Sequence, residues 1–188
     1  MRYLFLLFSL LSTMFISFGQ EHMSFKGVEM NCSASVFYSK MNASGFNLLY
    51  EKEGSYVMKG KFAGENATIV FKNSEVTNQV GAVVVFFEEK SSWASLKAQY
   101  LLFKKNLAEK YVMGLSDEYF DSPYYEGDGF EMSAVKLGKC HYDTKFEDKR
   151  GFIILSISED GEVSILYIDK IMWNKENDND QKQRMNDL

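Results

Sequence analysis

The sequence predicts an α+β fold, in which an antiparallel sheet of about six strands has helices packed on one face. Short runs with alternating apolar residues, such as residues 152–158, are typical of half-buried strands. Turn signals such as Asp160-Gly161 lie between these runs and favour hairpins. Residues 92–112 carry apolar side chains at helical spacing, which predicts a long helix lying on the sheet.

The chain begins with a pattern typical of a secretory signal peptide. Arg2 precedes an uncharged run over residues 3–18, and a small-x-small cleavage site ends at Gly19. The run is shorter than the roughly 20 residues that a membrane-spanning helix needs. The sequence therefore predicts that residues 1–19 are removed before Gln20 and that the mature protein is secreted or periplasmic. No integral membrane span is expected after cleavage.

The first half of the mature chain is expected to hold a short entry strand at residues 25–30, then one helix and four strands. Asn31 and Ser33 are good helix caps, and Gly45 lies where a helix usually ends. These signals predict a helix over residues 33–44. The strands that follow are expected at residues 46–50, 56–63, 67–72 and 80–87.

Residues 80–87 (VGAVVVFF) are apolar at both sets of alternating positions. A strand with one exposed face shows apolar residues mainly at every second position. This run therefore predicts a central strand that is covered on both sides, at least in part.

The long helix over residues 92–112 is expected to be the main apolar clamp on the sheet. Ser91 or Ser92 caps its start, and Gly114 ends it. Its apolar side chains are spaced three or four residues apart, so they form one stripe along the helix. The stripe consists of Trp93, Leu96, Tyr100, Phe103, Leu107 and Tyr111.

The second half is expected to open with a loop over residues 115–127, which contain the only proline, and a weak helix over residues 129–137. Residues 174–188 show no apolar periodicity, which predicts a disordered polar tail. A single domain is then expected over residues 20–173. Its last strands are expected at residues 139–147, 152–158 and 163–169.

The two halves show a weak internal repeat of secondary structure. Helix 33–44 precedes three of the strands, and the weak helix 129–137 precedes three more, with the long helix between them. Gly60-Lys61-Phe62 and Gly138-Lys139-Cys140 begin the matching strands. This is the pattern of a tandem αβββ duplication that builds one sheet.

Five segments carry a resemblance, and together they cover most of the mature chain: FKGVEMNCSASVFYSKMNASGF (25–46), GKFAG (60–64), WASLKAQYLLFKKNLAEKY (93–111), LGKCHYDTKFE (137–147) and ILYIDK (165–170). In these positions the chain resembles a family of small, uncharacterised secreted proteins from Gram-negative gut bacteria. The resemblance implies an exported α+β protein and carries no active-site motif. The tandem layout is also similar to that of the beta-lactamase inhibitor protein, which is a likeness of fold alone.

Composition limits the classes of partner. A formal net charge of −5 argues against nucleic acid, because binding to phosphates depends on Lys and Arg. Two cysteines remain in the mature chain, Cys32 and Cys140. They either form a disulfide in an oxidising compartment or are two small buried side chains, and the sequence leaves both alternatives open.

No motif predicts catalysis, a metal or a cofactor. His141 follows Cys140, but adjacent side chains on a strand point to opposite faces, so the pair does not form a catalytic dyad. The cysteines and histidines lack the spacing of zinc ligands. Acidic residues gather between positions 117 and 131, but their spacing matches no calcium-binding loop. We expect neither a cofactor nor a metal.

An aromatic cluster in the predicted loop is the best candidate for an interaction surface: Tyr119, Phe120, Tyr124 and Tyr125. The alternative is that these rings fold back as a lid on the sheet. The sequence thus favours a secreted or periplasmic binding module, whose sheet face or 115–128 loop contacts an unknown protein, peptide or glycan. The alternatives are a small hydrolase with an unrecognised carboxylate site and a structural component of the envelope.

Overall fold

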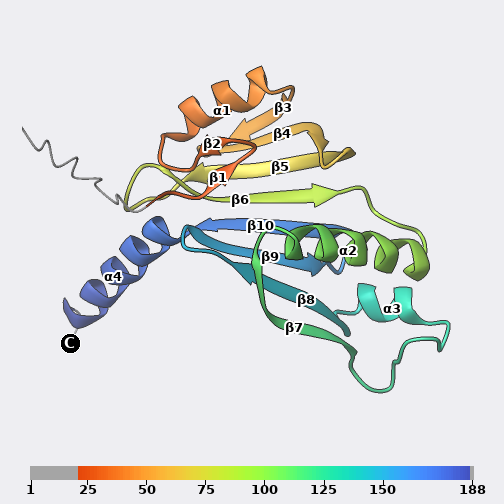
Figure 1. Cartoon of the computed structure of the whole chain (residues 1–188). Coiled ribbons are helices and arrows are strands. Elements are labelled where there is room, and N and C mark those ends of the chain that lie inside the picture. Colours follow the sequence, from red (N-terminus) through yellow and green to blue (C-terminus); the bar gives the residue numbers. More distant parts are fainter. Residues whose placement is uncertain (1–20, 187–188) are drawn as a thin grey trace, which may run out of the picture.

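The computed structural model describes residues 21–186. The predicted signal peptide and its cleavage site therefore lie outside the described residues. The described chain folds around one large antiparallel sheet and four helices (Figure 1).

The sheet has eight strands, so the expected number of about six is too low. β3 to β6 form one meander and β7 to β10 form another, and the two meanders meet where β6 pairs with β10. From one edge to the other the strands are β3 (Asn47–Lys52), β4 (Ser55–Phe62), β5 (Glu65–Asn73), β6 (Val80–Phe87), β10 (Val163–Asp169), β9 (Gly151–Ile157), β8 (Cys140–Glu147) and β7 (Val112–Phe120).

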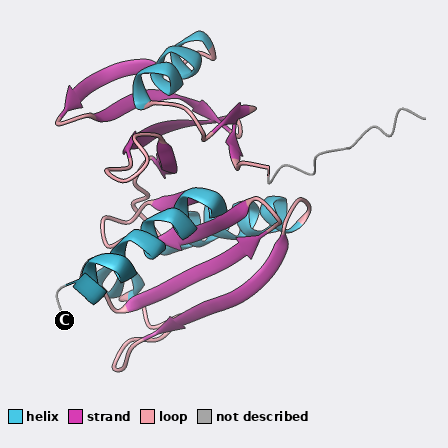
Figure 2. Ribbon diagram, turned by 90° about the vertical axis from the view of Figure 1, so that its left-hand side faces the viewer, coloured by secondary structure: helices cyan, strands magenta, loops and turns pink. Residues whose placement is uncertain are grey.

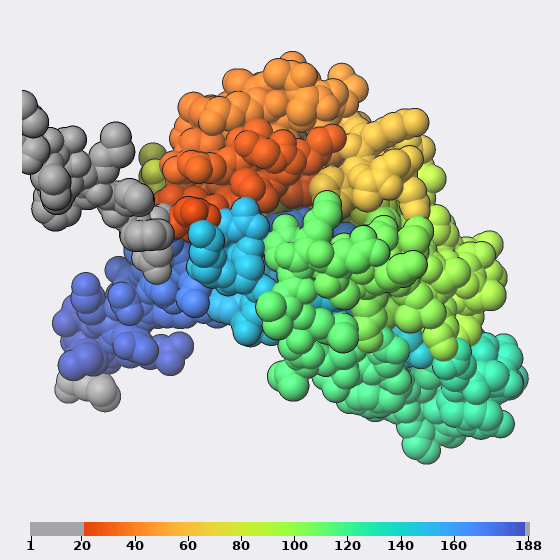
Figure 3. Space-filling view, viewed as in Figure 1, coloured from red at the N-terminus to blue at the C-terminus, as the bar shows by residue number. Residues whose placement is uncertain are grey.

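Helices cover one face of this sheet. α1 packs on β4 and β5, whereas α2 packs on β8, β9 and β10, and Figures 1 and 3 show both on the same side. α3 packs on β8 beside α2. The helices are α1 (Ala34–Ala43), α2 (Trp93–Ala108), α3 (Glu131–Lys136) and α4 (Lys170–Asn186).

A short hairpin, β1 (Ser24–Phe25) and β2 (Val28–Glu29), replaces the expected entry strand at 25–30. Lys26 and Gly27 form its turn with positive φ angles of 49° and 78°, the geometry that two-residue hairpin turns require. The ring of Phe25 stacks on Phe62 at 5.1 Å and meets Tyr167 edge-on at 5.4 Å. The hairpin therefore fills the helix-covered face beside α1 and α2.

The covered face holds the core, because every second residue of the central strands points toward the helices. The predicted stripe of α2 is confirmed as far as Leu107, since Leu96, Tyr100, Phe103 and Leu107 are all buried. The strands supply the opposing buried side chains, among them Met58, Ile69, Phe71, Val83, Val85, Ile153, Leu155 and Ile165.

The internal repeat differs from the predicted αβββ unit. Each meander of four strands follows one helix, which is α1 for the first and α2 for the second. The predicted second helix, 129–137, is α3, and it is an insertion between β7 and β8. From α1 to β10 the described chain therefore consists of two αββββ units with one inserted helix.

The predicted loop 115–127 is wrong in its first part, because residues up to Phe120 belong to β7. The predicted helix 92–112 is correspondingly too long, since α2 ends at Ala108. β7 is an edge strand, and all its residues but Phe120 are exposed. A strand exposed on both faces has no reason to alternate, so the sequence carries no strand signal there.

The predicted disordered tail is also different, because residues 174–186 lie in α4. Asp169 begins this helix: its Oδ1 accepts a hydrogen bond of 2.9 Å from the backbone N–H of Met172. Asp178 and Asp180 each precede a basic residue by four positions, a spacing that supports an exposed helix. Polarity alone therefore does not separate a solvated helix from a disordered tail.

Candidate functional site

The face of the sheet opposite α1, α2 and α3 is the main candidate surface, and we call it the open face. Cross-strand pairing places one apolar side chain from each of five neighbouring strands in a single row across it. The row consists of Val57, Val70, Val84, Leu166 and Ile154. Four of these five are half-buried, and only Val57 is counted as buried.

Further apolar side chains flank this row on both sides. Ala82, Ile168 and Phe152 form a second row toward α4, and Phe86 lies on the other side of Val84. Among the described residues no helix lies over the middle of these rows. α4 begins at their margin, at the end of β10 (Figures 1 and 2), where its Trp173 and Glu176 border Leu166 and Ile168. The expectation that residues 80–87 are covered on both sides, at least in part, is met only at Ala82, which α4 flanks. No helix lies over Val84 and Phe86 on this side of β6 among the described residues.

The two ends of the open face carry opposite charges. Lys59 and Lys61 on β4, with Lys72 on β5, occupy one end, and no outward carboxylate lies within those two strands. Glu88, just after β6, is the neighbouring acidic side chain, and it accepts a hydrogen bond of 3.1 Å from Asn66 Nδ2 of β5. Asp143 and Glu147 on β8 pair with Ser156 and Phe152 of β9 and occupy the other end. Two further charges extend these ends onto the edge strands, Lys52 on β3 and Asp117 on β7.

Lys145 is a positive charge within the acidic end, but its ammonium group already interacts with two neighbouring side chains. Its Nζ lies 4.3 Å from the centre of the Phe152 ring and 3.8 Å from Glu147 Oε2. The face of the Phe152 ring attracts the ammonium group. The open face therefore combines an apolar centre with one basic and one acidic end.

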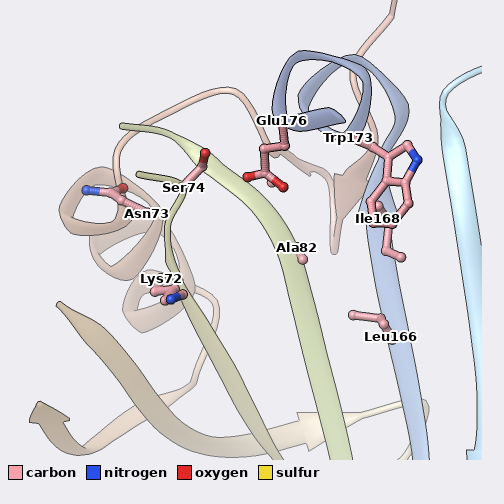
Figure 4. A pocket seen from close by; sticks show the side chains of 9 residues that line it. Lys72, Asn73, Ser74, Ala82, Leu166, Ile168, Trp173 and Glu176 are labelled. Carbon is pink, nitrogen blue, oxygen red and sulfur yellow. The ribbon is translucent and has the colours of Figure 1, made fainter. Parts of the chain in front are cut away.

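A hollow of about 270 Å³ lies where α4 leaves the open face (Figure 4). Ala82, Leu166 and Ile168 line its apolar part, and Trp173 of α4 lies beside Ile168 with 44% of its surface exposed. Glu176 reaches the hollow from the same helix (Figure 4). The hollow continues the apolar rows to the end of the sheet.

Two polar side chains at the hollow already serve the fold. Asn73 Oδ1 accepts a hydrogen bond of 2.6 Å from the N–H of Ala34 at the start of α1, and its Nδ2 donates to Asn78 Oδ1. Ser74 Oγ accepts from the backbone N–H groups of Val76 and Thr77. Because these polar groups already have partners, the hollow is an apolar depression with a polar margin.

The four predicted aromatic residues do not form one patch. Tyr119 points to the open face, where its ring stacks on His141 at 4.8 Å and is 51% exposed. The next residue, Phe120, points to the covered face and meets Trp93 edge-on at 5.0 Å. The alternation of a strand separates these neighbours, and the predicted loop gives no such alternation.

Tyr124 and Tyr125 lie in the loop after β7. Tyr124 is half-buried, whereas Tyr125 is 65% exposed. Glu126 fastens this loop to the covered side by accepting hydrogen bonds from Lys97, Trp93 and Tyr142. The Lys97 ammonium beside Glu126 holds the pKa of its carboxyl below the usual value. The loop therefore folds back on the sheet in part, which is the alternative to an exposed interaction surface that the sequence left open.

The cysteine and histidine residues form no catalytic group. Cys140 faces the core, and burial, with a smaller contribution from Asp143, raises its thiol pKa to about 12. His141 points the other way and lies 3.2 Å from Asp121 Oδ2. Cys32 and Cys140 are both free thiols, one before α1 and the other at the start of β8, so the structure does not contain the disulfide that was left open.

One carboxylate is buried among the described residues, and its role is structural. Asp169 Oδ2 accepts hydrogen bonds from the backbone N–H of Met23 at 2.6 Å and lies 3.0 Å from His22 Nδ1. Together with its cap on α4, this ties the start of the described chain to the end of β10. Within residues 21–186 no group of three or more His, Cys, Asp or Glu side chains is placed to hold a metal ion.

Comparisons of the chain with family models, with curated proteins and with solved structures find no match. In the part of the chain that the structure describes, no helix combines the length and apolar character needed to cross a bilayer. The functional reading therefore rests on the open face. The sequence predicted the sheet face as one possible contact surface but did not identify which residues form it. The signal is present, because Ile154, Leu166 and Ile168 are apolar at positions that alternate with buried ones.

Proposed function

We propose that this protein is an exported interaction module whose open face binds another protein. One observation carries the proposal: the central strands are apolar on both faces, and the helices cover only one. A contiguous apolar surface with charged margins is typical of a protein-binding surface. An exported location, as the leader predicts, places such a module in the periplasm or outside the cell.

The shape of the surface favours a protein over a small ligand. Small-molecule sites are concave and enclose most of the ligand. The open face instead spreads its apolar side chains over five strands, and its hollow lies at one end. Tyr50 extends the same surface onto β3, where it pairs with Val57 and is 57% exposed. A broad partner surface matches this arrangement.

Site-specific photo-crosslinking tests the proposal in the host that exports the protein. A photoreactive amino acid replaces Leu166 at the centre of the open face, and in a matched variant it replaces Leu102, which is 50% exposed on α2. Both side chains are apolar leucines on regular elements of opposite sides. We expect a covalent protein adduct from position 166 and none from position 102. No adduct from position 166, or equal adducts from both positions, would contradict the proposal.

A further inference from the structure

We infer that the partner of the open face is a second copy of this chain, stacked face to face about a two-fold axis. This inference rests on the proposed function, because it names the protein that the open face binds. Two-fold dimers bring one surface patch onto itself, so the patch must be complementary to itself. The charges and apolar rows of the open face meet that requirement.

The direction of the axis follows from the charges. If the axis runs between the two sheets and parallel to β6 and β10, the strand order of one copy is reversed over the other. β4 of one copy then faces β8 of the other, and β5 faces β9. The basic end of each copy meets the acidic end of its partner, which brings Lys59 over Asp143. An axis across the strands would instead place lysines over lysines.

The same axis superposes the apolar side chains. β6 of one copy lies over β10 of the other, so Val84 faces Leu166, and Val70 faces Ile154. Lys72 faces Phe152, a pairing that cation–π attraction permits. Stacked sheets pack about 10 Å apart with interdigitated side chains and a relative rotation of about 30°. Long lysine side chains can follow that rotation at the ends.

The size of the face suits a stable dimer. Eight strands about 4.8 Å apart, each with about seven residues at about 3.3 Å, cover on the order of 900 Å². Stable protein interfaces bury about 800 Å² on each partner. Trp173 lies at the end of the central strands, so the two copies of this residue come close to the axis. The dimer also supplies the second apolar cover that the composition of β6 predicts.

Sedimentation equilibrium of the exported chain with charge-swapped variants tests the inference. The wild type is expected to dimerise with rising concentration. Lys59→Glu with Lys72→Glu cancels the net positive charge of the basic end and places a carboxylate over Asp143, and Asp143→Lys with Glu147→Lys makes both ends basic. Each double variant alone should raise the dimer dissociation constant by about a hundredfold, because like charges now meet at both ends. An equimolar mixture of the two should restore association near the wild-type strength.

The outcomes separate this inference from the proposed function. A wild type that stays monomeric, or a dimer that neither swap weakens, overturns the face-to-face dimer. If position 166 nevertheless crosslinks to a different protein, the binding function stands and only the identity of the partner is wrong. Loss of both results removes both proposals. Urea midpoints of each variant close to wild type show that the swaps act on association, since these side chains lie on the surface.

Discussion

The two faces of the sheet use the same strands and nearly the same residue types, yet their surroundings differ. Leu155 on β9 points to the covered face and is fully buried, whereas Leu166 on the neighbouring β10 points to the open face and is half-buried. α1, α2 and the hairpin account for the first environment. Over most of the open face no helix lies among the described residues, and we propose that its apolar character serves association and not folding.

The largest difference between the faces should appear in a matched pair of truncations. Leu155→Ala leaves a cavity under α2 and should cost about 2–5 kcal/mol of unfolding free energy. Leu166→Ala should cost about 1 kcal/mol or less, measured at a concentration where the chain is monomeric, because its side chain gives up few contacts. Urea denaturation measures both, and equal losses would show that the open face is as well packed as the covered one.

Asp169 should be the most sensitive polar position, because it fastens the covered side at the end of β10. Asp169→Ala leaves the backbone N–H groups of Met23 and Met172 without their acceptor, and should cost about 2–4 kcal/mol, since each buried unpaired group costs about 1–3 kcal/mol. Asp169→Asn retains an acceptor oxygen and serves as the control with a smaller loss. Thermal unfolding of both variants checks this order, and an Ala variant as stable as the Asn variant would refute the role.

Two neighbouring aromatic residues on β7 allow the covered face and the open face to be compared within one strand. Phe120→Ala should cost about 1–3 kcal/mol, less than the 3–5 kcal/mol of a fully buried ring, because Phe120 is only partly buried against Trp93. Tyr119→Ala should cost less than about 1 kcal/mol, since its ring is half exposed on the other face. Denaturant midpoints give both values. A larger loss for Tyr119 would reverse the assigned directions of these side chains.

The smallest expected effect concerns Glu126 and depends on pH. The pKa of Glu126 is lower in the folded state than its usual value of about 4.3, so folding favours the charged form. Its contribution is present above the unfolded pKa and is lost as pH falls through the folded pKa. Because the side chain is 48% exposed, Glu126→Gln should cost at most about 0.5 kcal/mol at pH 7. Stability measured from pH 7 to pH 3 should show the two proteins converging at the acidic end.

The covered half of the molecule could be read from the sequence, because burial leaves a pattern. The stripe from Leu96 to Leu107 and the alternation of residues 152–158 predicted α2 and β9 closely. Strand β7 was missed, since an edge strand with exposed residues on both faces leaves no periodicity. α4 was missed because its many polar residues hid a helix that Asp169 caps.

The candidate site was only half predictable. The sequence revealed that residues 80–87 are apolar on both faces, but it could not reveal that, among the described residues, no helix lies over most of one face. It also grouped Tyr119 with Phe120, which strand alternation separates. Which side chains share a surface depends on the register between distant strands, such as β6 with β10, and no local pattern encodes that register.

Side-chain footprinting by hydroxyl radicals tests whether the open face associates, because it compares the two sides of the molecule in one sample. The exported protein is oxidised at low and at high concentration, and in the fluid of the compartment to which the host exports it. We expect oxidation of Phe86, Phe152 and Trp173 on the open face to fall on association, while the exposed Leu101 and Leu102 of α2 keep their rates. Unchanged rates on the open face under every condition, or protection confined to α2, would contradict association through the open face.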